Sequence, residues 1–146
     1  MNKHVLRLIL GGLIMVSTTL PLQAKDLTIR IVGIDTKRPG DIMVMLYGKD
    51  GYPKDHGKAV ATQNKKASAK ELDFKFKVSL NEFAVKVLHD ETMDGKVAKN
   101  WTGILPAEGL GFSNGARIRF GPPSFKRSKL DSSKVGNGIT IKMVYP

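Results

Sequence analysis

Leu72-Asp73-Phe74-Lys75-Phe76-Lys77-Val78 is the stretch that decides the fold. Its apolar residues alternate strictly with charged ones, and a period of two is typical of a β-strand with one buried and one solvated face. The same alternation recurs over residues 27–31, 83–88, 117–120 and 139–145, and turn-forming residues separate these stretches. We therefore expect a chain built from short strands, with Phe74 and Phe76 in the core.

Two other segments differ from this pattern. Residues 42–47 form an unbroken apolar run, which indicates a strand covered on both faces. Residues 58–70 are polar and rich in Ala and Lys without a clear period, so a short helix and an irregular crossover both stay open. Residues 100–115 are dense in glycine and are expected to be loop.

The connections between strands suggest how they pair. Only residues 79–82 separate the strands expected over 72–78 and 83–88, and so short a link predicts a hairpin. Residues 124–130 are a further candidate strand. About seven strands without a long amphipathic helix predict an all-β fold, an antiparallel β-sandwich of immunoglobulin-like or transthyretin-like type.

The N-terminus has the pattern of a secretory signal. Lys3 and Arg7 precede an apolar run over 8–16, and a polar stretch ends at Ala24. The run is far shorter than the roughly 20 residues that span a bilayer, which argues against a membrane anchor. We expect a signal peptide over 1–24, cleavage after Ala24, one domain over 25–146, and a periplasmic or secreted protein without a transmembrane segment.

Composition narrows the chemistry. The chain has no cysteine, which excludes disulfides, thiol catalysis and zinc–thiolate sites. Its 24 Lys and Arg exceed its 13 Asp and Glu. Export makes nucleic acid an unexpected partner, so the basic excess points to an anionic envelope surface or to solubility alone. The basic residues Arg117, Arg119, Lys126, Arg127 and Lys129 are the candidates for contact with an anionic surface.

A polar segment from His89 to Lys96 resembles a cation-binding loop in part. Asp90 and Asp94 fall on ligand positions of a helix-loop-helix calcium loop, but the positions taken by Ala98 and Trp101 offer no side-chain oxygen. The alternative is a β-turn in which both aspartates accept backbone N–H groups and Gly95 takes a positive φ. No cofactor is expected, and calcium at Asp90 and Asp94 is the alternative.

Two catalytic patterns are incomplete. Residues 111–115 match the glycine-flanked serine of a nucleophile elbow, but no histidine follows Ser113, which points to a turn whose Ser113 and Asn114 bond the local backbone. The loop carboxylates Asp90, Glu91, Asp94 and Glu108 could serve a hydrolase, although nothing in their spacing sets their separation. A non-catalytic domain is the preferred hypothesis, and the hydrolase is its alternative.

Several motifs carry a resemblance to a known family. They are Phe83-Ala84-Val85 before His89-Asp90-Glu91, then Asp94-Gly95-Lys96, residues 103–114 and Gly121-Pro122-Pro123-Ser124-Phe125. On these residues the chain resembles the DUF2141 family of small exported bacterial proteins. The resemblance implies a β-sandwich and an exported context, and it brings no established activity. The family pattern carries Asn where Thr92 and Asp94 stand and Asp where Ala98 stands, so this chain lacks part of any cation loop that the pattern suggests.

The functional hypothesis follows from where special residues gather. They concentrate in loops over 89–114, and binding residues tend to lie in loops. We expect an exported domain that binds an envelope ligand or protein partner there, with the polar cluster outside the packed interior. The candidate binding residues are His89, Asp90, Glu91, Asp94, Trp101, Glu108, Phe112, Ser113 and Asn114. Adhesion to anionic lipid or polysaccharide through the basic residues is a further alternative.

Overall fold

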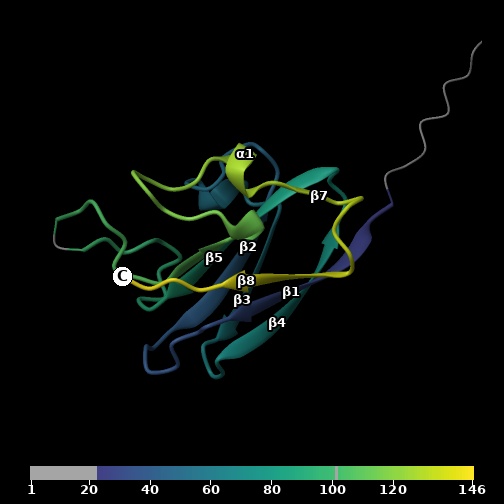
Figure 1. Cartoon of the computed structure of the whole chain (residues 1–146). Helices are drawn as coiled ribbons and strands as arrows, with labels where there is room; N and C mark the ends of the chain where they lie inside the picture. Colours follow the sequence, from purple (N-terminus) through teal and green to yellow (C-terminus); the bar gives the residue numbers. More distant parts are fainter. Residues whose placement is uncertain (1–22, 101) are drawn as a thin grey trace, which may run out of the picture.

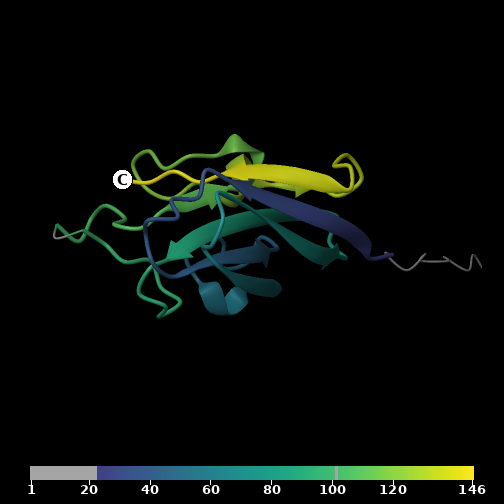
Figure 2. The ribbon, with the colours of Figure 1, turned by 90° about the horizontal axis from the view of Figure 1, so that it is seen from below.

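The computed structural model describes residues 23–100 and 102–146, which form two β-sheets packed face to face (Figures 1 and 2). The predicted signal peptide and Trp101 lie outside the described residues, apart from Gln23 and Ala24. One sheet has the order β4 (Glu71–Val78), β1 (Lys25–Val32), β8 (Gly138–Lys142). The other has the order β3 (Ala61–Lys66), β2 (Asp41–Tyr47), β5 (Glu82–Asp90), β6 (Leu110–Phe112), and β7 (Leu130–Asp131) also pairs with β5. The all-β sandwich expected from the sequence is confirmed.

The main core lies between the two sheets. Alternate residues of β1 and β4 face alternate residues of β2 and β5, and Phe74 and Phe76 are buried there as predicted. The opposite face of β4 carries exposed Lys75 and Lys77. Strict alternation in this strand thus reflects a sheet with one wet face.

The predicted hairpin between residues 72–78 and 83–88 is wrong. β4 pairs with β1, and β5 pairs with β2, so the short link between them crosses from one sheet to the other. The difference lies in burial: β4 has a wet face, whereas β5 is buried from Phe83 to Asp90 and occupies the interior of the larger sheet. One pairing also departs from the antiparallel pattern, because β8 runs parallel to β1.

The larger sheet carries a second, smaller core on its outer face. Met45, Tyr47, Leu88, Leu110 and Phe112 pack there beneath the surrounding loops. Residues 42–47 are buried on both faces, as the unbroken apolar run predicted. This outer face is where the pockets of the molecule lie.

Two expected strands are absent from the described structure, and two unpredicted ones are present. Residues 117–120 have no regular structure, and 124–130 contains the short helix α1 (Phe125–Ser128). The edge of β5 is already paired with β6 and β7, so residues 117–120 have no neighbour there despite their alternation. β3 was missed because it is a polar edge strand, and β6 because only three residues of a glycine-rich stretch take part.

The remaining helices are single turns. They are η1 (His56–Lys58) and η2 (Ser113–Gly115). None of the helices in the described part of the chain has the length and apolar character needed to cross a membrane.

Candidate functional site

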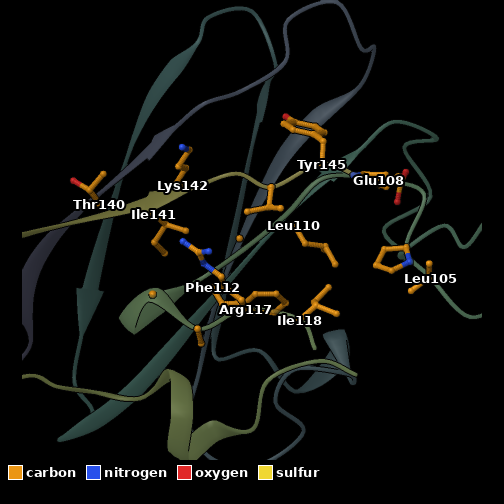
Figure 3. Close-up of a pocket in the computed structure, with 16 residues that line it drawn as sticks. Leu105, Glu108, Leu110, Phe112, Arg117, Ile118, Thr140, Ile141, Lys142 and Tyr145 are labelled. Atoms are coloured by element: carbon orange, nitrogen blue, oxygen red, sulfur yellow. The ribbon is translucent and has the colours of Figure 1, made fainter. Parts of the chain in front are cut away.

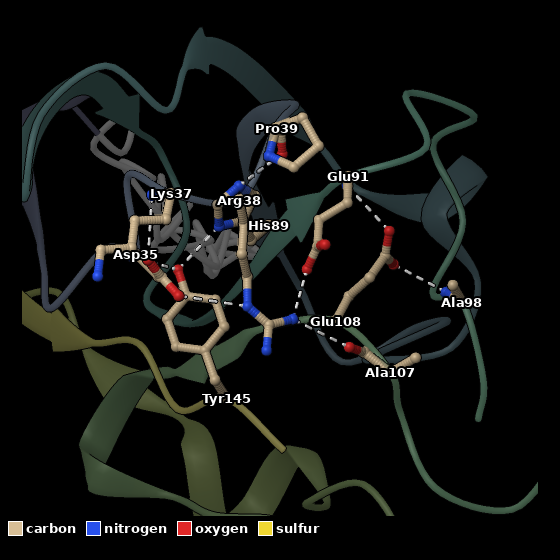
Figure 4. Close-up of polar contacts among 10 residues, drawn as sticks. All are labelled: Asp35, Lys37, Arg38, Pro39, His89, Glu91, Ala98, Ala107, Glu108 and Tyr145. Carbon is tan, nitrogen blue, oxygen red and sulfur yellow. Dashed lines mark hydrogen bonds and ion pairs between the residues drawn. The ribbon is translucent and has the colours of Figure 1, made fainter.

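The polar cluster predicted from the sequence is drawn into the fold rather than left outside it. His89 is fully buried, and its Nε2–H donates to the carbonyl of Pro39 at 2.9 Å. Its Nδ1 accepts from the hydroxyl of Tyr145 at 2.8 Å, and that hydroxyl in turn accepts from the backbone N–H of Asp35 (Figure 4). The expectation of an exposed cluster was wrong for His89 because its ring joins the C-terminal segment to the loop before β2.

Asp90 and Asp94 organise the turn that follows β5. The carboxylate of Asp90 accepts from the backbone N–H of Asp94 at 3.2 Å and from that of Gly95 at 2.8 Å. Asp94 accepts from the N–H of Lys96, which lowers the pKa of its carboxyl group, and Gly95 has φ +72°. This is the β-turn alternative drawn from the sequence, and it is confirmed.

Glu91 and Glu108 fix the rest of the same loop. Glu108 is 3 % exposed and accepts from the backbone N–H of Glu91 at 2.9 Å and of Ala98 at 2.8 Å (Figure 4). Glu91 pairs with Arg38 at 2.8 Å, and this contact raises the pKa of the guanidinium. All four candidate carboxylates therefore hold loop backbone or a neighbouring cation.

Ser113 and Asn114 bond to backbone, but to distant rather than local segments. Ser113 Oγ accepts from the N–H of Val85 at 2.9 Å and donates to the carbonyl of Ser128 at 2.6 Å. Asn114 donates to the carbonyl of Arg127 at 3.2 Å. The local prediction was wrong because η2 lies between β5 and α1 and uses these side chains to bind both.

The other candidates are placed as follows. Within residues 23–100 and 102–146, no group of three or more metal-ligating side chains is gathered as a metal site requires, and calcium binding stays a prediction. Arg117, Arg119, Lys126 and Arg127 are exposed, while Lys129 pairs with Glu82. The binding roles assigned to these residues also stay predictions.

The largest hollow among the described residues lies over the outer face of the larger sheet and measures about 1180 Å³. We call it the Lys86 pocket. Its floor is Lys86 from β5 with Leu110 and Phe112 from β6, and its walls come from the segments 53–56, 94–99, 104–106 and 118–122. Lys86 lies between Met45 and Phe112 in the register of the sheet, so a cation stands in the middle of an apolar floor.

Lys86 is 5 % exposed and has two described hydrogen-bond acceptors. Its amine donates to the carbonyl of Pro53 at 2.9 Å and to Nε2 of His56 at 2.7 Å. Burial lowers the pKa of Lys86 to about 8. The pKa of His56 is also lowered, first by burial and then by the charge of Lys86.

The tautomer of His56 follows from its second contact. Its Nδ1 lies 2.6 Å from the carbonyl of Gly95, which can only accept, so Nδ1 carries the proton. The unprotonated Nε2 is then free to accept from Lys86. Gly95 belongs to the turn organised by Asp90, so the predicted cluster indirectly positions this pair.

A second pocket of about 470 Å³ adjoins the first, between β6 and β8 (Figure 3). We call it the β8 pocket. Leu110, Phe112 and Ile118 line both hollows, and Ile141, Lys142 and Tyr145 close the far side of the smaller one. Glu108 and Arg117 bring charge to its edge.

Exposed apolar side chains gather at these pockets. Ile104, Leu105 and Phe120 line the Lys86 pocket, Leu105 also lines the β8 pocket, and Val144 lines the latter. Each is more than half exposed. Large apolar side chains left in water around a hollow are typical of a binding site.

Positive charge surrounds the larger hollow. Its basic side chains are Lys54, Lys86, Lys96, Lys99 and Arg119, and its acidic ones are Asp55 and Asp94. Such a rim favours an anionic or electron-rich group on a ligand.

Sequence reasoning missed Lys86 and His56, although one signal was present. Ala84, Lys86 and Leu88 occupy one face of β5, and an isolated lysine between apolar residues at period two indicates a buried amine. Nothing in the sequence places His56, 30 residues earlier, beside it. Of the predicted residues, Asp94, Glu108 and Phe112 line the pockets.

Comparison with known proteins identifies one family. The model of a family described as "Uncharacterized protein conserved in bacteria (DUF2141)" matches residues 29–139. The match includes β1 to β7 and every segment that lines the Lys86 pocket. Neither curated proteins nor solved structures gave a match to this chain.

Proposed function

Because the chain belongs to the DUF2141 family, whose description names no activity, we propose a function from its own pockets: it binds a small amphipathic molecule. The apolar body of the ligand lies over Leu110, Phe112 and Ile118, and an oxygen-bearing head group reaches Lys86. The observation that carries this proposal is the buried amine in the floor of a hollow that is otherwise largely apolar. Ligand pockets combine these features, a large apolar lining and a few convergent polar groups.

The size and openness of the site suit this class of ligand. The Lys86 pocket is large enough for a drug-sized molecule, and the adjoining β8 pocket extends the apolar surface. The bonds made by Asp90, Glu91 and Glu108 hold the loop that forms one wall. On this proposal the polar cluster has a supporting role and the ligand contacts lie beside it.

We further propose that the protein acts after export, as its N-terminal pattern predicts. The placement of Lys25 as the first residue of β1 supports this, because removal of residues 1–24 would leave every strand intact. N-terminal sequencing of the protein purified from its native envelope should begin at Lys25, and an intact N-terminus would contradict processing.

Displacement of a fluorescent probe tests the binding proposal. 8-Anilinonaphthalene-1-sulfonate should bind the purified protein and be displaced by decanoic acid, because both combine an apolar body with an anionic head. Lys86→Met should weaken decanoic acid binding at least tenfold by removing the polar partner of the head group. Lys75→Met, on the wet face of β4, is the matched control and should change nothing.

A second pair of variants tests the apolar wall. Phe120→Ser removes an exposed side chain of the pocket and should weaken decanoic acid binding several-fold without unfolding the protein. Val60→Ser changes an exposed apolar side chain that lines neither pocket. Equal affinities for all four variants and the unchanged protein would show that the ligand does not occupy this site.

A further inference from the structure

We propose that Lys86 captures aldehydes: its amine condenses with the carbonyl carbon of an apolar aldehyde in the Lys86 pocket to form an imine. This inference rests on the proposed function, because it names a chemical class of ligand for the same site. It adds a covalent step to what would otherwise be reversible docking.

The hydrogen bonds of Lys86 match a neutral amine. An ammonium has three protons to donate, whereas the described residues give Lys86 two acceptors, the carbonyl of Pro53 and Nε2 of His56. A neutral amine satisfies both acceptors with its two protons and keeps one lone pair. Because Lys86 also lines the hollow, an aldehyde held over Phe112 can meet that lone pair.

The protonation behaviour of Lys86 supports the same conclusion. Burial lowers its pKa to about 8, so roughly half of this amine is neutral at pH 8. An exposed lysine with an ordinary pKa near 10.4 is less than about 1 % neutral at that pH. Only the neutral amine is nucleophilic, and this is how lysines are activated for imine formation in apolar sites.

The reaction can be written so that all atoms balance. The lone pair of Nζ forms a bond to the carbonyl carbon, and the carbonyl π electrons move to oxygen. One proton passes from nitrogen to that oxygen to give a carbinolamine. The oxygen then takes a second proton and leaves as water, while nitrogen and carbon form the C=N bond.

His56 is placed to move these protons. Its Nε2 lies 2.7 Å from the amine nitrogen and carries no proton in the resting tautomer, so it can accept the proton that nitrogen loses. It can then return that proton to the departing oxygen. Nδ1 stays bonded to Gly95 throughout, which keeps the ring in position.

Reductive trapping tests the inference. Purified protein is incubated with decanal and sodium cyanoborohydride at pH 7.5, and peptide mass spectrometry follows the decylation of each lysine over time. Lys86 should be modified at least tenfold faster than Lys54 or Lys99, which are exposed on the rim of the same pocket. Decanoic acid should suppress the modification of Lys86 and leave that of exposed Lys75 unchanged.

Variants refine the result without being needed for it. His56→Gln should slow modification of Lys86 at least fivefold while leaving decanoic acid binding within twofold, because glutamine can accept from the amine but cannot relay its proton. Modification of Lys86 no faster than that of Lys99, or insensitive to decanoic acid, would overturn the inference. An unchanged rate in His56→Gln would overturn the proton transfer assigned to His56.

The outcomes separate the two proposals. If decanal displaces the fluorescent probe but leaves Lys86 unmodified, the covalent step is wrong and the binding function stands. If decanal neither displaces the probe nor modifies Lys86, both proposals are wrong.

Discussion

Lys86 shows how one residue can be stable in the fold and still be poised for chemistry. Taking a cation out of water costs several kcal/mol unless it is paired, and here it has two neutral acceptors and no described carboxylate partner. Its lowered pKa is the expression of that cost. The site therefore gives up stability at neutral pH for a reactive amine.

The pH dependence of stability should report this cost. The pKa of Lys86 is about 8 in the folded protein against 10.5 for an ordinary lysine, so between these values the unfolded chain binds more protons than the folded one. Stability contributed by Lys86 must therefore rise as pH increases through this window. Relative to Lys86→Met, the unchanged protein should gain about 3 kcal/mol between pH 7.5 and 10.5.

Urea unfolding of both proteins at several pH values measures this difference. His56, Asp55 and Asp94 face the same pocket, and they titrate below the window, so they do not contribute to the change within it. The substitution Lys75→Met, at an exposed position, should show no such divergence. Parallel stability curves for the unchanged protein and Lys86→Met would mean that the buried amine has an ordinary pKa.

Single residues were predictable from the sequence where their partners are close in the chain. The turn at Asp90, Asp94 and Gly95 was readable because every bond spans a few positions. The pairing of Lys86 with His56 was not, since it depends on how the loop before β3 folds over the sheet. The buried state of His89 likewise depends on Tyr145, 56 residues later.

At the scale of elements, alternation located strands but did not assign their partners. Residues 27–31 and 72–78 are strands as predicted, yet the expected hairpin was wrong because chain proximity competes with the burial that each face demands. Residues 117–120 alternate equally well and form no strand. A strand needs an unpaired edge to join, and that information is not local.

The η2 turn illustrates what holds the irregular elements. Ser113→Ala removes the acceptor for the buried N–H of Val85 and should destabilise the protein by about 1–3 kcal/mol. Because η2 precedes the segment that walls both pockets, decanoic acid affinity should fall as well. Urea unfolding and probe displacement measure the two effects, with exposed Ser68→Ala as the control. Unaltered stability in Ser113→Ala would show that the hydroxyl is dispensable.

At the scale of the whole molecule, charge sets the remaining behaviour. The chain carries a formal net charge of +11, and the exposed Arg117, Arg119, Lys126 and Arg127 lie in the segments around α1. Exposed Phe120 stands in the same region. This combination suits the adhesion alternative, in which cations approach an anionic surface and an apolar side chain enters it.

Vesicle sedimentation tests that alternative. Vesicles containing phosphatidylglycerol should bind the protein at low salt and release most of it at about 0.5 M salt, where charges are screened beyond a few Å. Arg117→Glu with Arg119→Glu should abolish binding. Lys75→Glu with Lys77→Glu makes the same change of charge on β4 and should weaken binding far less. Binding that ignores salt, or that both double variants lose equally, would remove a specific basic face.

The class of fold was accessible from the sequence because it depends on the period of the pattern, and the sandwich is confirmed. The pockets were not accessible, since they arise where loops from five parts of the chain meet over one sheet face. Composition likewise indicated a basic protein without showing which cations surround a hollow.

The neighbours of β1 have a consequence for biosynthesis. The first strand of the domain lies between β4 and β8, so one of its two edges stays open until residues 138–142 have left the ribosome. A nascent chain cannot complete the smaller sheet, and its main core cannot close. If the chain is exported as its N-terminus predicts, this late closure keeps it loosely folded, the state that threading through a narrow translocation channel requires.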